Sequence, residues 1–395
     1  MIEFKFNVFC VVLVAGFSIV AFSAHSAENK AVVPLPISMG NSLSFDANPS
    51  SLNLGGLGIW RISPVMSGFT YSQTNPSGGA GDLSNAQLLI QKISGDFQFF
   101  IQTGLYAVPT LGEPIARSFS NTVDTYGYVP NASISYSINS NWSITAGKSA
   151  SMGGYESMMT YQNLNIQRGL LWGQTSAVST GATVNYSAGN MSFAVTWNDG
   201  FDSDKMNWLG ASGTYQLNNK ENVTFSWVGP TSGNAQNTDN TPLLQNNSQI
   251  FNAIYTYTGD RWFIAPYLQY TVVSKNESIS IASQYQTYGV ALLTNYRFPD
   301  VHWQGIGQAK VSLPFRVEYI QEHGGNQGDP SSMLYGPNSS AVSLTLTPTI
   351  QVDQYFARIE GSLVQISQAQ PGLGLGSSGT KASQYRIMLE VGVLF

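Results

Sequence analysis

The chain has 395 residues, of which only 10% are charged, and its formal net charge is −5. An ordinary soluble domain has about 25% charged residues, so the composition argues against a water-soluble globular protein. After residue 27 no apolar run reaches the roughly 20 residues that a membrane helix needs, which excludes a helical membrane protein. The negative charge and the lack of a basic cluster argue against a nucleic-acid partner.

Residues 1–27 are predicted to be an export signal. One lysine precedes an apolar run at 8–22, and small residues follow at 23–27. This is the order of a secretory signal peptide, with cleavage expected within 24–27; an uncleaved anchor helix is the alternative. The only cysteine, Cys10, would be removed with the signal, so the exported chain is expected to have no disulfide and no thiolate metal site.

Residues 28–64 are expected to form an N-terminal periplasmic segment, either a tail or a small helix at a barrel mouth. From residue 65 to 395, apolar and polar residues alternate with the period of two that indicates strands. Sixteen strands are predicted, at 65–71, 86–93, 97–105, 132–138, a strand ending at 148, 182–186, 191–197, 209–217, 223–227, 251–257, 262–272, 288–298, 313–319, 342–346, 355–363 and 383–395. Fourteen or eighteen strands are the alternatives.

The connections follow a regular rhythm. Short turns alternate with long loops rich in Gly, Asn and Ser, and only the turn at 299–308 is longer than the rhythm predicts. Short periplasmic turns, long external loops and an even strand number are typical of bacterial outer-membrane barrels. The fold class expected is therefore an all-β, transmembrane, antiparallel up-and-down barrel with both termini in the periplasm.

The last strand fixes which face meets lipid. Its odd positions from 385 to 395 are Tyr, Ile, Leu, Val, Val and Phe, whereas Arg386 and Glu390 are at even positions. An Arg on the lipid face near mid-membrane costs about 2–4 kcal/mol, so Arg386 and Glu390 should face the lumen. Phe395 ends the chain and is expected to be the signal that the barrel-assembly machinery reads.

The same phase predicts a charged wall inside the barrel on four of the last five strands. Its members would be Arg297, Arg316, Glu318, Arg358, Glu360, Arg386 and Glu390. Two readings stay open: such a wall can set the selectivity of a channel through its field, or it can pair Arg with Glu between neighbouring strands and stiffen the sheet.

The longest external loop, 148–179, is the third one, where sixteen-stranded general porins fold a segment into the lumen. A loop of this length is usually functional or disordered, and its Tyr, Met and Trp content argues against disorder. It is expected to be a channel constriction or, alternatively, an ordered surface cap. The candidate residues of this loop are Lys148, Tyr155, Glu156, Asn163, Asn165 and Arg168.

Aromatic residues near the predicted strand ends suggest girdles at the two membrane interfaces. They are Trp197, Trp208, Trp227, Tyr257, Trp262, Tyr296 and Phe298, whereas Phe100, Tyr106 and Phe263 are in the inward phase.

No enzymatic or metal motif is found. His302 and His323 have no Ser, Asp or Glu placed as a triad requires, and their spacing fits no metal motif. Asp199, Asp202 and Asp204 could form a hard-cation site, but a solvated turn is the preferred interpretation. No cofactor, no metal and no catalytic residue are expected.

Short motifs give the chain a resemblance to a known family. They are the TAGK sequence at 145–148, Gly154-Tyr155-Glu156, Asn163, Asn165 and Arg168, Thr180-Gly181, and PFRVEY at 314–319. In these the chain resembles the OmpL-like family of outer-membrane β-barrel porins. The resemblance implies a porin-like barrel and leaves the substrate open. The sequence departs from the expected pattern at Gly169, where a small hydroxyl residue would follow Arg168.

The function expected is an outer-membrane porin, a water-filled channel for passive diffusion of small hydrophilic solutes and ions. The alternatives are a non-conducting barrel that acts as an adhesin or envelope structural protein, and a substrate-specific channel. Export through the general secretory pathway of a Gram-negative bacterium is expected, with outer-membrane lipid, lipopolysaccharide and the barrel-assembly machinery as partners. A homotrimer is suggested by analogy alone.

Overall fold

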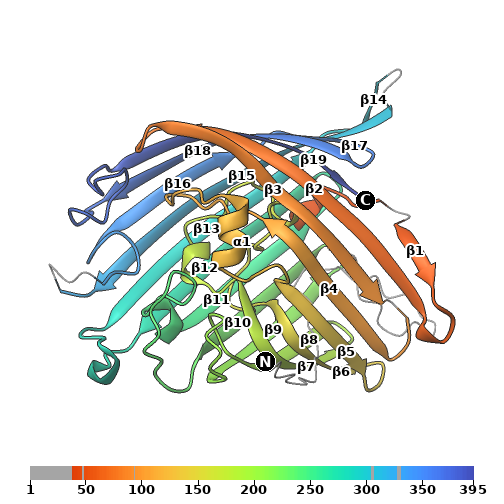
Figure 1. The fold of residues 1–395 in the computed structure, drawn as a ribbon, viewed down its shortest axis with the longest axis horizontal. Coiled ribbons are helices and arrows are strands. Elements are labelled where there is room, and N and C mark those ends of the chain that lie inside the picture. Colours follow the sequence, from red (N-terminus) through yellow and green to blue (C-terminus); the bar gives the residue numbers. More distant parts are fainter. Residues whose placement is uncertain (1–37, 47–48, 93, 304–306, 327–330) are drawn as a thin grey trace, which may run out of the picture.

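One antiparallel sheet forms the wall of the molecule and closes on itself (Figure 1). The computed structural model describes residues 38–46, 49–92, 94–303, 307–326 and 331–395, so the predicted signal at 1–27 lies outside the described residues. The sheet closes because β19 (Ser383–Leu394) pairs with β2 (Ile59–Gln73) along nine residue pairs, from Arg386 and Gln73 to Leu394 and Val65.

The closed wall has sixteen strands, which confirms the predicted number. Besides β2 and β19 they are β3 (Gly78–Lys92), β4 (Phe97–Tyr106), β5 (Asn131–Ser137), β6 (Trp142–Ala150), β7 (Val178–Ala188), β8 (Met191–Asn198), β9 (Trp208–Asn218), β10 (Glu221–Pro230), β11 (Ser248–Thr258), β12 (Trp262–Val273), β13 (Tyr285–Arg297), β15 (Gly307–Gly324), β16 (Ser340–Leu346) with β17 (Thr349–Val352), and β18 (Tyr355–Ser367). We call the end with the short connections the turn end and the opposite end the loop end.

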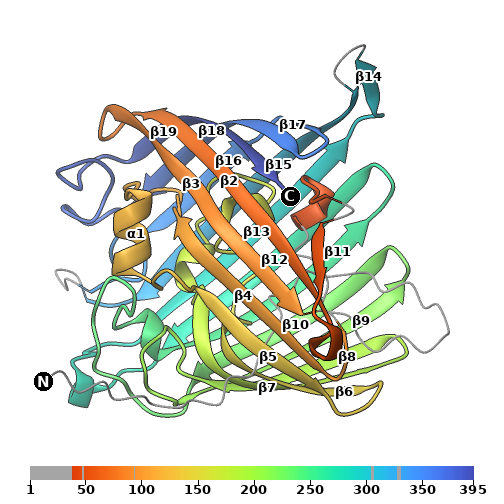
Figure 2. The same ribbon diagram turned by 45° about the vertical axis from the view of Figure 1, so that its right-hand side comes forward.

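Three shorter strands explain departures from a simple wall. β16 and β17 form one wall strand, because both pair with β15 and β18 and are separated only by Thr347 and Pro348, where proline lacks an N–H. β1 (Ser50–Asn53) pairs with the start of β2. β14 (Val301–Trp303) pairs with the start of β15 and projects beyond the wall (Figure 2). The long turn at 299–308 is therefore an extension of a hairpin.

In the described residues, helices occur only outside the wall strands. α1 (Ser118–Asp124) lies between β4 and β5, and its first residue donates both its N–H and its hydroxyl to Asp82. The 3-10 turns are η1 (Met39–Asn41), η2 (Gly55–Leu57), η3 (Thr160–Gln162), η4 (Trp172–Gln174), η5 (Gln245–Asn247) and η6 (Glu277–Ile279). Within the described ranges, none of these helices has the length and hydropathy to cross a bilayer.

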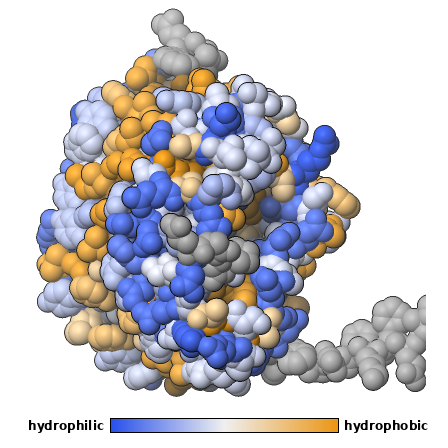
Figure 3. Space-filling view, turned by 90° about the vertical axis from the view of Figure 1, so that its left-hand side faces the viewer, coloured by the Kyte–Doolittle hydropathy of each residue, from blue (hydrophilic) through white to orange (hydrophobic). Residues whose placement is uncertain are grey.

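The two faces of β19 have opposite polarity, as its alternation predicts. Tyr385, Ile387, Leu389 and Val391 are exposed on the outside, whereas Arg386, Met388 and Glu390 are buried inside. The space-filling view of the loop end agrees, because hydrophilic residues cover much of this face and hydrophobic residues of the wall border it (Figure 3). The apolar outer surface is the one that a closed barrel presents to lipid.

One member of the proposed aromatic girdles was assigned to the wrong face. Trp197 and Trp262 are exposed on the outer surface, but Trp208 is only 1% exposed. In the register of β8 and β9, Trp197 is opposite Leu209 and Trp208 is opposite Asn198, so Trp208 faces inward. It packs on Phe201 and Gly200, where an added Cβ would lie 2.3 Å from the indole nitrogen. The inward prediction for Tyr106 and Phe263 is confirmed, since both are buried.

Substitutions on the outer face of the wall test directly which residues of the strands face lipid. We expect Leu389→Arg, at the middle of β19, to lower the free energy of unfolding by about 2–4 kcal/mol, because its guanidinium would face lipid. Tyr355→Arg, at the turn end of β18, should cost about 0–1 kcal/mol near the interface. Urea unfolding of the protein in lipid vesicles, followed by tryptophan fluorescence, measures both. Equal costs at the two positions would contradict the assignment of the membrane-facing side.

Candidate functional site: a loop folded against a charged inner wall

The connection between β6 and β7 does not cover the barrel from outside but enters it. Every residue from 163 to 171 is buried, and the hydrogen bonds of this stretch reach inward-facing side chains of β15, β18 and β19. We call residues 151–177 the inner loop. It includes η3 and η4, and three wall glutamates hold it in place.

Glu360 on β18 binds the middle of the inner loop. Its carboxylate accepts the backbone N–H groups of Ile166 and Gln167, the latter at 3.0 Å, and the Gln167 side-chain amide at 2.8 Å. The hydroxyl of Thr347 donates to the same carboxylate at 2.8 Å. An irregular backbone in a dry interior needs such acceptors or donors, because an unpaired buried N–H costs about 1–3 kcal/mol.

Glu318 on β15 binds the next stretch of the inner loop. It accepts the N–H groups of Leu170 at 3.0 Å and Leu171 at 3.3 Å, and the hydroxyl of Ser343 at 2.7 Å. Arg316 Nε lies 3.2 Å from Glu318 Oε2, without the alignment of a hydrogen bond. One wall carboxylate therefore fixes two successive loop residues.

Glu156 is the acidic residue that the inner loop itself contributes. It forms an ion pair with Arg316 and accepts the N–H of Gly169 at 2.7 Å. Burial raises the pKa of Glu156, and the nearby Arg316 partly offsets that rise. At Gly169 an added Cβ would lie 2.1 Å from Glu318 and 2.7 Å from Glu156. This explains why glycine follows Arg168 in place of a small hydroxyl residue, because two carboxylates lie against the backbone at position 169.

Glu390 on β19 completes the set through Arg358 on β18. The two form a buried ion pair with Arg358 Nε 3.0 Å from Glu390 Oε2. Thr160 of the inner loop donates to Glu390 at 2.8 Å, and Arg358 donates to the carbonyl of Asn163 at 3.2 Å. Both residues of this ion pair therefore bind the inner loop.

The remaining two arginines are bound largely by carbonyl groups. Arg168 donates to the carbonyls of Ser157 at 3.1 Å and Ile166 at 2.8 Å, and burial lowers its pKa to about 10. Arg386 donates to Gln73 Oε1 at 2.7 Å and to the carbonyl of Glu113 at 2.7 Å. Both arginines tie the inner loop to the connection that follows β4, since Arg168 N–H donates to Pro109 and Arg386 also binds the carbonyl of Thr110.

Eight of the predicted site residues are brought together in this network, which we call the Arg–Glu cluster. Four are arginines and four are glutamates, so their formal charges cancel; they are Glu156, Arg168, Arg316, Glu318, Arg358, Glu360, Arg386 and Glu390. Removal of one partner from a buried pair typically costs about 3–5 kcal/mol, because it leaves the other charge uncompensated. The cluster is therefore a structural anchor for the loop, whatever its effect on ions.

The other predicted residues lie outside the cluster or support the loop differently. Lys148 pairs with Asp202 at 2.9 Å, and Arg297 donates to the carbonyl of Gly259 at the turn end. The rings of Tyr155 and Tyr267 are in tilted contact, with an interplanar angle of 52° and centroids 5.8 Å apart. Asn163 holds two parts of the inner loop together, because its side chain accepts the N–H of Ser157 and donates to the Ser157 carbonyl, and Asn165 donates to Thr347 at 2.7 Å.

Two features of the loops were missed or misread. Gln167, which bonds Glu360, Ser362 and Arg386, gave no signal because an irregular loop has no period. The turn with the three aspartates is not simply solvated: Asp199 is 1% exposed and accepts the N–H of Thr180 at 2.7 Å. Burial raises the pKa of Asp199 to about 6.

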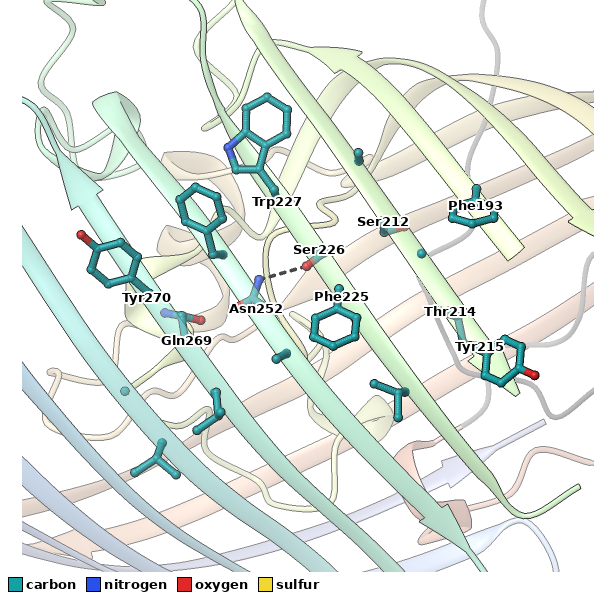
Figure 4. Close-up of a pocket in the computed structure, with 18 of the residues that line it drawn as sticks. Phe193, Ser212, Thr214, Tyr215, Phe225, Ser226, Trp227, Asn252, Gln269 and Tyr270 are labelled. Carbon is teal, nitrogen blue, oxygen red and sulfur yellow. Dashed lines mark hydrogen bonds between the residues drawn. The ribbon is translucent and has the colours of Figure 1, made fainter. Parts of the chain in front are cut away.

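Little space separates the inner loop from the wall at β6 to β8. A cavity of about 20 Å³ lies between Ser151–Met152 and inward residues such as Thr183, Thr196 and Asn198, which is room for about one water molecule. A larger hollow of about 1010 Å³ is on the outer wall across β8 to β13, where Phe193, Phe225 and Trp227 surround small residues (Figure 4). The outer hollow faces lipid and does not belong to the lumen.

A closed sixteen-stranded antiparallel barrel with an apolar outer face and a loop folded inside is the architecture of a porin of the Gram-negative outer membrane. OmpT of Vibrio cholerae, expressed in the outer membrane, has a similar fold, with a TM-score of 0.56, 10% identity, and 88% of this chain and 100% of that chain covered. OmpF of Salmonella typhi, in a complex with daunomycin, is similar with a TM-score of 0.54, 13% identity, and 88% and 100% covered. At these identities the likeness concerns the fold alone.

The chain belongs to the family described as "Putative beta-barrel porin-2, OmpL-like", which matches residues 65–395. This match confirms the resemblance that the short motifs gave. None of the curated proteins matches the chain.

The anchoring role of the cluster can be tested at Glu360. We expect Glu360→Gln to weaken the hold on the inner loop by about 1–3 kcal/mol, because a neutral amide accepts the N–H groups of Ile166 and Gln167 poorly. Limited proteolysis of the folded barrel, with cleavage sites mapped by mass spectrometry, should then detect cuts within 151–177. Glu221→Gln, at the turn-end start of β10 and away from the inner loop, is the matched control. Equal protection of the loop in both variants would show that Glu360 does not anchor it.

Proposed function

We propose that this porin forms a narrow channel through which small hydrophilic solutes and ions diffuse, with the loop 148–179 as its constriction. The observation that carries the proposal is the attachment of the inner loop to Glu318, Glu360 and Glu390 on three wall strands. A loop fixed in this way narrows the lumen permanently. A loop that merely capped a surface would need no buried carboxylates.

The size of the barrel supports a channel. A sixteen-stranded barrel encloses an aqueous passage unless something folds into it. The contacts of the inner loop extend round the wall from β11 through β19 to β3 and β4, for example from Asn252 with Gly153 to Asn85 with Thr160. The inner face of β6 to β10 instead bears uncharged hydroxyl and amide groups, for example Thr183, Thr214 and Asn222.

The Arg–Glu cluster combines the two hypotheses for the charged wall, a structural role and an effect on passing ions. Its main role in the proposal is to hold the constriction, because each charge has a partner in the dry interior. Its field on passing ions would then be weak, since arginines and glutamates are balanced. The proposal assigns transport and no catalytic step, in keeping with the porin family.

Several partners belong to the same proposal. Phe395 is exposed and its N–H donates to Pro64 at 3.1 Å, which leaves its ring available to the barrel-assembly machinery. Four further features are proposed together with the channel. They are export through the general secretory pathway, periplasmic termini, contact with lipopolysaccharide and a homotrimer.

Single-channel recording in planar bilayers tests the proposal. We expect ion current from the purified protein, and a larger conductance when residues 155–171 are replaced by a short Gly-Ser linker, because the obstruction inside the barrel is removed. The same replacement at residues 235–239, an exposed part of an external loop, is the control and should leave the conductance unchanged. No current at any voltage would contradict the channel.

The ion preference of the channel tests separately whether the charges of the Arg–Glu cluster balance one another. We expect the double change Arg316→Ser and Arg358→Ser to shift the reversal potential toward cations, because Glu156, Glu318 and Glu390 lose their counter-ions. Lys220→Ser at an exposed turn serves as the control. An unchanged reversal potential in a salt gradient would mean that the cluster acts on the loop alone.

A further inference from the structure

A second obstruction lies at the turn end of the barrel. We infer that residues 38–46 are an internal plug that seats in the turn-end mouth and limits conduction until it leaves. The inference rests on the proposed channel. It adds that a segment of the same chain regulates conduction through that channel. In Figure 2 the segment, in red, lies at the end of the barrel where the C-terminus is marked.

The segment lies against the wall at the mouth, from β12 and β13 to β17, and on to β19, β2 and β3. On the side of β12 and β13, Asn295 donates to the carbonyl of Gly40 at 3.3 Å, and an added Cβ on Gly40 would lie 2.8 Å from the ring of Phe263. On the side of β17, Gln351 accepts the N–H of Ser44 at 2.8 Å and donates to its carbonyl at 2.6 Å. Because β13 and β17 both pair with β15, these contacts fix the segment along one arc of the mouth.

Apolar contacts seat the same segment. Leu43 is only 2% exposed and packs in a cluster with Val65, Leu89 and Leu394, which are inward residues of β2, β3 and β19. The ring of Phe45 meets Tyr161 edge to face, with centroids 5.6 Å apart. A leucine buried inside the mouth of a barrel cannot belong to a tail that trails freely in solution.

The segment also touches the inner loop. Gly40 approaches Leu164, and Phe45 approaches Tyr161; both partners belong to residues 151–177. The inner loop and the segment therefore form two successive layers along the axis of the barrel. A solute on this side of the lumen meets first one layer and then the other.

The chemistry of the two layers differs, and the difference indicates which one moves. The inner loop is held by buried charged residues, whereas the segment is held by neutral hydrogen bonds and apolar packing, with Asp46 and Lys310 making contacts at its rim. It takes no part in the sheet, and among the described residues its only regular structure is η1. It can therefore leave the mouth without breaking the wall or releasing the inner loop.

Expulsion of the segment provides the test. Leu43→Asp places an unpaired carboxylate in a dry site, which should drive the segment out. We expect the single-channel conductance to rise, because one of two obstructions in series is removed. Leu52→Asp is the matched control, because Leu52 is in the same part of the chain but is exposed on β1; its conductance should stay that of the unaltered protein.

Thiol labelling shows independently whether the segment is seated. Ser42 is buried, so in Ser42→Cys the thiol should react slowly with a membrane-impermeant maleimide, and fast once Leu43→Asp is added. Ser51→Cys, on the exposed β1, should react fast in both backgrounds.

The outcomes separate the two proposals. Unchanged conductance in Leu43→Asp with fast labelling at position 42 would overturn the plug and leave the channel intact. Fast labelling of Ser42→Cys in the otherwise unaltered protein would also overturn it. Absence of current from the unaltered protein and from Leu43→Asp alike would overturn the channel, and with it any role of the segment in conduction.

Discussion

The bilayer core offers no hydrogen-bond partner to a peptide group, and the rest of this structure depends on that constraint. A sheet in lipid must close, since each free edge would leave unpaired N–H and carbonyl groups. The pairing of β19 with β2 provides the closure. Once the sheet is closed, alternate residues of every strand face lipid or the interior, which explains why an apolar outer surface coexists with a polar and charged inner one.

The same constraint acts a second time inside the barrel. The inner loop has an irregular backbone, and its N–H groups are buried where little water can reach them. Glu318 and Glu360 accept four of these groups from the wall, and Arg316 in turn lies beside Glu318. The charges that alternation places on the inner wall thus serve to hold backbone, and the position of the inner loop follows from where those glutamates are on their strands.

The interior consequently has two layers of different strength. The inner loop is fixed by charge-assisted hydrogen bonds, which are stronger than neutral ones. Residues 38–46 are fixed by neutral bonds and by Leu43. In the proposed channel, the more weakly held segment could leave the mouth while the wall and the inner loop stay in place.

The sequence by itself determined the sixteen strands, their inward and outward faces and the entry of Arg316, Glu318, Arg358, Glu360, Arg386 and Glu390 into the interior, because a period of two is a local property. Tertiary structure alone decided which charges meet, since Glu156 and Arg316 are 160 residues apart. It also decided the inward turn of Trp208, the need for glycine at position 169 and the seat of residues 38–46. These depend on contacts between segments that lack a period, and such contacts exist only after the barrel has closed.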